Sequence, residues 1–421
     1  MWMTSGRLCW EGDPCNELLG TNMRACRFGF AGRTCLRSGR PMRAVRIRPH
    51  ATATGTEERH TDMAMAAGMG LSWSGFEAWR RESREDIAWG DEGSVRPTDP
   101  PTTSSPALAA PLAERARQVL LTPDPRSKAL LSIRAFNAFR EEVIAGCATI
   151  GRADAPDHPA RPPLPRIVEA RDVPRPRDMR GRMSLPAYMI HNCEQLRAAA
   201  CVRACVRACS NNRSIDPSFP PSFLPSFVRS HIVAHIELNA IDLAWDTVCS
   251  FSHRGAADAD APLPLAFFED FARVASDEAR HLLWCLQRLE GELGSSYGAL
   301  DSHDLLWRAS HATRHDLLAR LVAVPMVQEA RGLDAGPRLV DKLERAGDAR
   351  SAAIVTQIAK EETAHVAVGV YWFQHLCAMG GIDPTAAFHE QAAIHCAESL
   401  RGPFNDPARF EAGLPAHWYQ V

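Results

Sequence analysis

Several features that mark common protein classes are missing from this sequence of 421 residues. No run of about eighteen apolar residues occurs, and the best candidate, 317–327, is interrupted by Arg320 and Pro325. The sequence therefore predicts no membrane-spanning helix. The thirteen cysteines include no Cys-x-x-Cys pair, which argues against a zinc ribbon or a thioredoxin-type redox site.

Lysine is scarce, since the chain contains only Lys128, Lys342 and Lys360, while arginine is common throughout and the formal net charge is −2. Without a basic excess, nucleic acid is not an expected partner. The scattered cysteines favour a reducing compartment, which makes the cytoplasm the default location. The arginine-rich residues 1–56 leave organelle targeting open as an alternative.

The first part of the chain has little periodic structure. Residues 1–105 end in a stretch rich in Pro, Ser and Thr, and we expect a disordered or transit-like extension with a short helix around 73–89. Residues 106–196 differ, because two stretches with helical spacing, 108–121 and 127–144, precede a Pro/Arg-rich strap. The strap is expected to run extended over a surface.

Residues 197–228 consist of short tandem repeats, Ala-Cys-Val-Arg followed by Pro-Ser-Phe. Cysteines four residues apart share a helix face and offer soft ligands to a metal. The repetition itself favours the other interpretation, a low-complexity insertion, because it explains both halves at once.

Residues 229–401 read as long amphipathic helices with few breakers, and 402–421 form a C-terminal tail. No segment shows the alternation of a strand, so the fold class is predicted to be all-α. Four long helices and a fifth, shorter one are expected, covering 229–252, 263–293, 302–332, 348–379 and 384–400. Helices of this length can form a four-helix bundle with a site in its interior.

Two of these helices carry a Glu-x-x-His motif within their apolar face. Glu278 and His281 lie three residues apart on the second helix, and Glu362 and His365 repeat the spacing on the fourth. Charged groups that face a core are costly unless they are paired or bind a metal. The residues before each motif, Asp277 and Glu361, are expected to support the histidines from outside.

The first and third helices each offer one glutamate on the apolar face, Glu237 and Glu329. Glu237 and Glu278 are 41 residues apart, and Glu329 and Glu362 are 33 apart. Either interval is long enough for the chain to run up one helix and down the next, which brings the two glutamates to the same level along the bundle. The order Glu, Glu-x-x-His, Glu, Glu-x-x-His suits a carboxylate-bridged site for two metals. The predicted metal ligands are Glu237, Glu278, His281, Glu329, Glu362 and His365.

A ligand set of four carboxylates and two imidazoles suits iron or manganese better than zinc or copper. Open coordination positions would admit dioxygen, peroxide or water. The alternative is a set of buried Glu–His or Glu–Arg pairs that hold the helices in register without metal.

At these residues the sequence resembles the ferritin-like superfamily of di-iron and di-manganese carboxylate proteins, and more narrowly the family catalogued as domain of unknown function 455. The resemblance covers about residues 107–419, with 197–228 as an insertion. It is carried by 120–125, 234–238, 277–281, 329–334, 362–367 and 402–405. The resemblance implies a ferritin-like four-helix bundle with extra N-terminal helices, and it implies no particular reaction.

We therefore expect a non-haem di-iron oxidoreductase that activates dioxygen, with hydroxylation of a small organic substrate as one such reaction and an electron-transfer protein as a partner. Two alternatives stay open. One is a manganese catalase or peroxidase with the same ligands, and the other is a metal-free helical scaffold. A membrane is not an expected partner.

Overall fold

The computed structural model describes residues 73–82, 89, 109–173, 223–255, 262–397 and 399–420. Within these ranges the regular structure is helical, and the one β feature is an isolated bridge between Ile167 and Ser302. The predicted all-α class is confirmed. None of the described helices is long and apolar enough to cross a membrane. Most of the predicted N-terminal extension and most of the repeat segment 197–228 lie outside the described residues.

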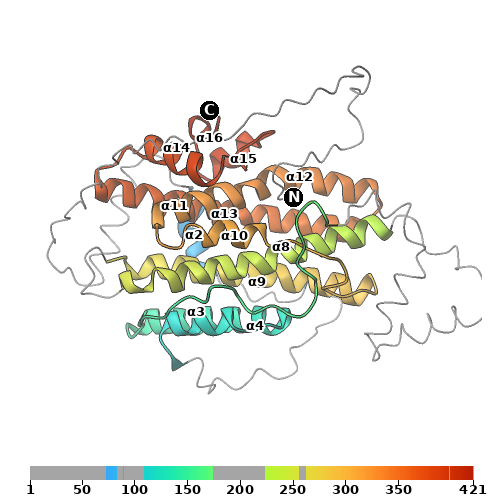
Figure 1. Ribbon diagram of the computed structural model, residues 1–421, viewed down its shortest axis with the longest axis horizontal. Coiled ribbons are helices and arrows are strands. Elements are labelled where there is room, and N and C mark those ends of the chain that lie inside the picture. The colour runs from blue at the N-terminus through green and yellow to red at the C-terminus, as the bar shows by residue number, and fades with distance from the viewer. Residues whose placement is uncertain are drawn as a thin grey trace, which may run out of the picture.

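The longest helices make up the centre of the molecule (Figure 1). Helix α8 packs against α9, and α13 packs against α12, the π-helical segment η4 and α9. Their bounds are Phe223–Ser250 for α8, Leu265–Gln287 for α9, Val322–Glu329 for η4, Ala330–Arg345 for α12 and Ala349–Gly380 for α13. Buried aliphatic and aromatic side chains from these helices form the main core.

Shorter helices cover two opposite sides of this centre (Figure 1). On one side α3 packs on α8, and α4 packs on α9; on the other, α14 packs on η4 and α13. The remaining elements are α2 Phe76–Arg81, α3 Leu112–Leu120, α4 Pro125–Ala145, η2 Ser252–Gly255, η3 Arg288–Glu292, α10 Leu305–His311, α11 Leu317–Leu321, α14 Pro384–His395, α15 Asp406–Glu411 and α16 Ala416–Tyr419. The short helix expected around 73–89 is therefore present as α2.

Local signals account for the start and end of α4. The Asp124 carboxylate accepts a hydrogen bond of 2.8 Å from the Ser127 amide, and Pro125 occupies the first turn, where its missing N–H costs nothing. Gly146 ends the helix with a φ of 72°, a conformation that glycine adopts without strain.

The helix predicted at 302–332 is not continuous, and this prediction was wrong in two respects. Residues 312–316 form a turn between α10 and α11, because Asp316 caps a new helix by accepting from the Ala319 amide at 3.1 Å. The helical path then continues beyond 332 to Arg345. At the other end of the domain, α8 begins at Phe223 rather than at 229.

The π-helical segment η4 contains Pro325, which cannot donate to the helix ladder. Its partner α13 comes unusually close at Gly369, where an added Cβ would lie 2.5 Å from Cβ of Pro325. Only glycine allows this approach. The close packing holds Glu329, four residues after Pro325, beside α13.

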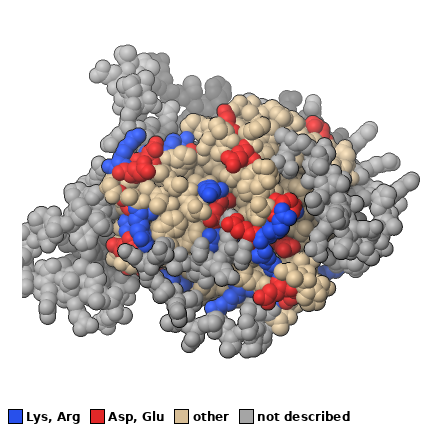
Figure 2. Space-filling model, turned by 180° about the vertical axis from the view of Figure 1, so that it is seen from behind, with Lys and Arg blue, Asp and Glu red and all other residues tan. Residues whose placement is uncertain are grey.

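Residues 147–173 contain no helix, and the segment contacts α10 where the Asp157 carbonyl accepts a 3.1 Å hydrogen bond from the Trp307 indole. Arg161 of this stretch reaches Asp242 at 2.8 Å, and Asp242 also pairs with the fully buried Lys128 at 2.6 Å. Burial lowers the pKa of Lys128 to about 8, and the nearby Asp242 opposes the shift. On the face in Figure 2, basic and acidic side chains are interspersed, in keeping with the small net charge.

Candidate metal centre

The six predicted ligand residues come from four helical segments and are all buried. Glu237 lies on α8, the first Glu-x-x-His motif on α9, Glu329 at the end of η4, and the second motif on α13. Their exposed fractions are 8% for Glu329, 6% for Glu362, 3% for Glu237, 1% for His365 and 0% for Glu278 and His281. Each helix face selected by its apolar stripe therefore does point inward.

Four of these residues form one compact group. Ligand atoms of Glu237, Glu278, His281 and Glu362 all lie within 4.8 Å of one another. Nδ1 of His281 is 3.3 Å from Oε2 of Glu237 and 3.3 Å from Oε2 of Glu278. The same nitrogen is 3.8 Å from Oε1 of Glu362. One imidazole nitrogen thus faces three carboxylates from three helices.

His365 joins the group from the other side. Its Nδ1 lies 2.8 Å from Oε1 of Glu278 and 3.3 Å from Oε2 of Glu362. The two imidazole rings are 5.9 Å apart between centroids, and Glu278 contacts both of them. Glu278 is therefore the carboxylate that both histidines share.

Glu329 is set slightly apart from the others. In the described part of the chain its carboxylate makes no hydrogen bond or ion pair. It nevertheless lies close enough to the other carboxylates for their charges to change its pKa. Burial and then the charges of Glu362 and Glu278 raise its pKa well above the ordinary value. The structure thus brings five of the six predicted residues into contact and leaves Glu329 adjacent.

The carboxylates and imidazoles influence one another strongly. Burial raises the pKa of Glu237 and of Glu362. Burial also acts on Glu278, but the positive charges of His365 and His281 prevail and lower its pKa. In turn, nearby carboxylates overcome burial and raise the pKa of both histidines well above normal. Without a metal, protons therefore balance much of the negative charge.

Four atoms of this group that could bind a metal are buried and have no hydrogen-bond partner. They are Oε2 of Glu237, Oε1 of Glu278, Oε2 of Glu362 and Nδ1 of His365. These atoms lie at ion-pairing distance from their neighbours but form no hydrogen bond with them. Buried polar atoms left in this way are costly unless something else satisfies them. The cluster can hold a metal ion.

Two further acidic residues, Asp277 and Glu361, here called the outer carboxylates, contact the far nitrogens of the histidines. Oε2 of Glu361 lies 3.0 Å from Nε2 of His281, and Oδ2 of Asp277 lies 3.6 Å from Nε2 of His365. Each helix supports the histidine of the other. The contact with Glu361 is a hydrogen bond that orients the His281 ring, whereas Nε2 of His365 lies near Asp277 without a hydrogen bond. In both histidines Nδ1 faces the cluster.

Arg280 and Trp79 complete the surroundings, and the sequence analysis missed both. Nη1 of Arg280 bridges the outer carboxylates, 3.1 Å from Asp277 and 2.9 Å from Glu361. The indole of Trp79 donates a 2.9 Å hydrogen bond to Oδ2 of Asp277. Arg280 stands inside the first motif, so its position was a usable signal. Trp79 is 198 residues away in the chain, and no sequence pattern connects it to the site.

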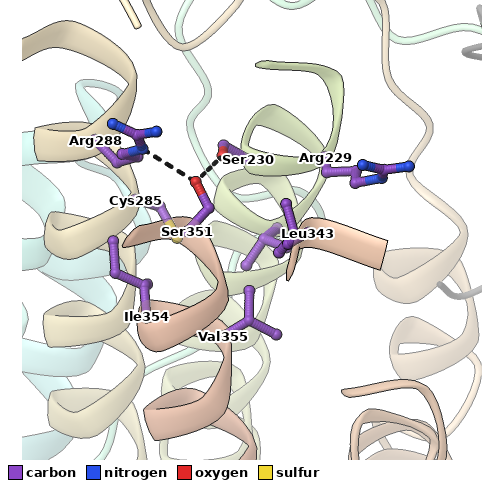
Figure 3. A pocket seen from close by; sticks show the side chains of 9 residues that line it. Arg229, Ser230, Cys285, Arg288, Leu343, Ser351, Ile354 and Val355 are labelled. Carbon is purple, nitrogen blue, oxygen red and sulfur yellow. Dashed lines mark hydrogen bonds between the residues drawn. The ribbon is translucent and has the colours of Figure 1, made fainter. Parts of the chain in front are cut away.

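A small cavity is lined by residues of α8, α9, η3, α12 and α13 (Figure 3). Val233 and Cys285 line it, one turn from Glu237 and His281 respectively. Ser351 also lines it, and its hydroxyl accepts a hydrogen bond from Nε of Arg288 at 3.0 Å. The volume is about 10 Å³, which is room for about one water molecule.

The fold and the cluster together define an all-α protein with a buried carboxylate–imidazole group that can hold metal. Residues 225–420 match the family described as "Protein of unknown function (DUF455)". All six predicted ligands lie within this matched range. This match supports the narrower resemblance of the sequence. A Haemophilus influenzae protein, named "Uncharacterized protein", is 36% identical over 182 residues. That alignment covers 43% of this chain and 62% of the relative. No solved structure matches.

Proposed function

We propose that the protein has a ferritin-like four-helix bundle with a two-metal site, and that it is a non-haem di-iron oxidoreductase that uses dioxygen to oxidise an organic substrate, for instance by hydroxylation. The observation that supports the proposal is a set of buried oxygen and nitrogen atoms on Glu237, Glu278, Glu362 and His365. Each lies at ion-pairing distance from a neighbour but has no hydrogen-bond partner. A cation between them would satisfy all four at once.

The donor set supports iron or manganese. Four carboxylates offer hard oxygen ligands, and each histidine offers one nitrogen, Nδ1, because its other nitrogen faces an outer carboxylate. Glu278 would offer one oxygen beside each histidine, since its two oxygens approach different imidazole rings. Glu329, which has no partner of its own among the described residues, would supply the remaining ligand.

Two bound iron ions would supply the electrons and open coordination positions that reduction of dioxygen requires. The chain's own residues would hold the ligands in place and exclude bulk water. Glu361 fixes the His281 ring, and Arg280 fixes the two outer carboxylates relative to each other. The ligand residues are themselves almost completely buried, which would limit the access of water to the cluster.

Metal content is the first test. Purified protein is expected to retain about two iron ions per chain, as this type of site requires. Anaerobic loading with ferrous iron, followed by oxygen, should then give the optical spectrum of an oxidised di-iron site. Retention of manganese with rapid breakdown of hydrogen peroxide would instead support a catalase. A protein that binds neither metal would be a scaffold, held together by the His–Glu contacts within the cluster.

A further inference from the structure

A large cleft lies between α2, α12, α13 and α15, beside the candidate metal centre. Its volume is about 1270 Å³, more than enough for a drug-sized organic molecule. Four indole rings line it, those of Trp73, Trp79, Trp89 and Trp284. None of the six predicted metal ligands lines this indole-lined cleft, so it is a separate feature of the molecule.

The two inner rings of the cleft already stack against cations of the chain itself. The guanidinium carbon of Arg273 lies 5.0 Å from the centroid of the Trp79 ring, and that of Arg280 lies 4.8 Å from the Trp284 ring. The electron-rich face of an indole attracts such a charge. Both rings are almost completely buried, and cation binding by indole is therefore already a feature of this part of the molecule.

The two outer rings, those of Trp73 and Trp89, are half-buried, and no cation of the described residues stacks on them. Trp73 lies against Gly75, where an added Cβ would be 2.3 Å from the ring. The Gln287 side chain accepts a 3.0 Å hydrogen bond from the Trp89 amide and donates one of 3.1 Å to its carbonyl. The fold thus holds both residues in place and leaves part of each open to the cleft.

The charged side chains that line the cleft are mainly acidic. Four acidic side chains line it against two basic ones, an excess of two negative charges. Arg280 and Glu361 are buried and offset each other through a contact of 2.9 Å. The remaining basic residue, Lys360, is exposed. The other acidic side chains are also exposed, and they are Glu82, Asp341 and Glu411. Such an excess attracts a cation from solution.

We infer that the indole-lined cleft is a binding site for an aromatic organic cation, a flat ring system that carries a quaternary or protonated nitrogen. Trp73 and Trp89 stack on its rings and attract its charge, because indole is the side chain that attracts cations best. The exposed acidic side chains supply the long-range attraction. The site needs no metal in the cluster, so it goes beyond the proposed oxidation.

The test measures binding of N-methylquinolinium, a flat aromatic cation, to the full chain by isothermal titration calorimetry. Quinoline, which is uncharged at neutral pH and has the same ring system, is the matched probe. The cation should bind about tenfold more tightly, because it alone gains the contacts between charge and indole and the attraction of the acidic side chains. Added salt should reduce this difference, since those acidic side chains are exposed.

Variants of the outer rings locate the binding site. Trp73→Leu and Trp89→Leu should each weaken binding of the cation by about fivefold, because each removes one ring that stacks on it. Phe410→Leu is the control, since Phe410 is an aromatic residue of α15 that is 71% exposed and lies outside the cleft. It should change the affinity by less than about twofold, because the site keeps all its rings.

Variants of the exposed charges leave the core intact. Asp341→Asn and Glu411→Gln, combined in one chain, should weaken binding of the cation by about threefold, as expected for exposed charges. Binding of quinoline should stay the same, because no ring is removed. Glu344→Gln is the control, since Glu344 is exposed on α12 three residues after Asp341 but lies outside the cleft.

Equal affinities of the unaltered protein for N-methylquinolinium and for quinoline would overturn the inference, because the cleft would then bind rings without regard to charge. So would cation binding by Trp89→Leu that is as tight as that by Phe410→Leu. If a ring variant does not fold in thermal unfolding experiments, equal cation binding by the double charge variant and Glu344→Gln would overturn it instead. Iron content tests the proposed function separately, so either claim can fail while the other stands.

Discussion

Two pairs of buried histidines stand in contrast within this molecule. His281 and His365 have a pKa well above normal, whereas burial lowers the pKa of His231 to about 4 and that of His235 to about 3. Exposed fractions are small for all four, from 0% to 7%. Burial alone would lower the pKa of each, so the neighbouring groups decide the direction.

The groups that hydrogen-bond to the second pair are uncharged, and the positive charge of Arg161 adds to burial in lowering the pKa of His235. Nε2 of His231 accepts hydrogen bonds from the amides of Gly298, at 3.0 Å, and Leu300, at 3.4 Å, so it must be unprotonated. His235 contacts the Tyr297 hydroxyl and the His303 carbonyl. These hydrogen bonds connect α8 to the loop that follows η3. The first pair faces carboxylates instead, which is the arrangement that a metal site needs and a structural contact does not.

The largest effect is expected from removing Glu278, the carboxylate that both cluster histidines share. Glu278→Ala should abolish two-metal binding, because it deletes contacts to His281 and His365 together. Binding can be measured by competition with a coloured chelator. Glu269→Ala, on the same helix but outside the cluster, serves as the control and should bind as the unaltered protein does.

Adding metal should raise the free energy of unfolding of the unaltered protein, by about 2.7 kcal/mol at a free concentration 100 times the dissociation constant. Glu278→Ala should show no such increase in thermal unfolding experiments. An equal increase in both proteins would contradict the assignment of the cluster as the metal site.

The lowered pKa of the second histidine pair predicts that the protein loses stability in acid. His231 has a folded pKa of about 4 against an ordinary value of 6.5. Its contribution is therefore fully present above pH 6.5 and is lost as the pH falls toward 4, a change of about 3 kcal/mol. His231→Gln should reduce the pH dependence of the free energy of unfolding in this window, measured by denaturant titration.

The control for this prediction is His253→Gln, which alters an exposed histidine just beyond the end of α8. It should leave the pH dependence unchanged. If His231→Gln and His253→Gln behave alike, the amide contacts of His231 do not govern its protonation.

The smallest expected effect distinguishes the two outer carboxylates. Glu361→Gln should weaken metal binding by about tenfold, near the low end for partners of metal-binding histidines. Asp277→Asn should have a smaller effect, because Asp277 lies 3.6 Å from His365 whereas Glu361 lies 3.0 Å from His281. The ratio of the two affinities, from the same chelator assay, tests whether contact distance controls ring orientation here.

The helical periodicity predicted much of the centre of the molecule. The faces that carry Glu237, Glu278 and Glu362 were identified from neighbouring apolar residues, and all three side chains are buried in one group. The helix at 302–332 was misjudged because Asp316 begins a new helix within an apolar pattern that continues through it. Periodicity reports which face is apolar, and a capping carboxylate acts on the backbone independently of that pattern.

The sequence by itself determined the all-α class, the long helices and the residues that face their core, because apolar spacing acts within each helix. Only the tertiary structure decided how closely those faces meet: Gly369 lets Pro325 approach α13, while Glu329 stays outside hydrogen-bond contact. It also decided that Trp79 reaches Asp277 across 198 residues of chain. Such contacts depend on how helices pack against one another, and packing between distant segments leaves no periodic trace in one sequence.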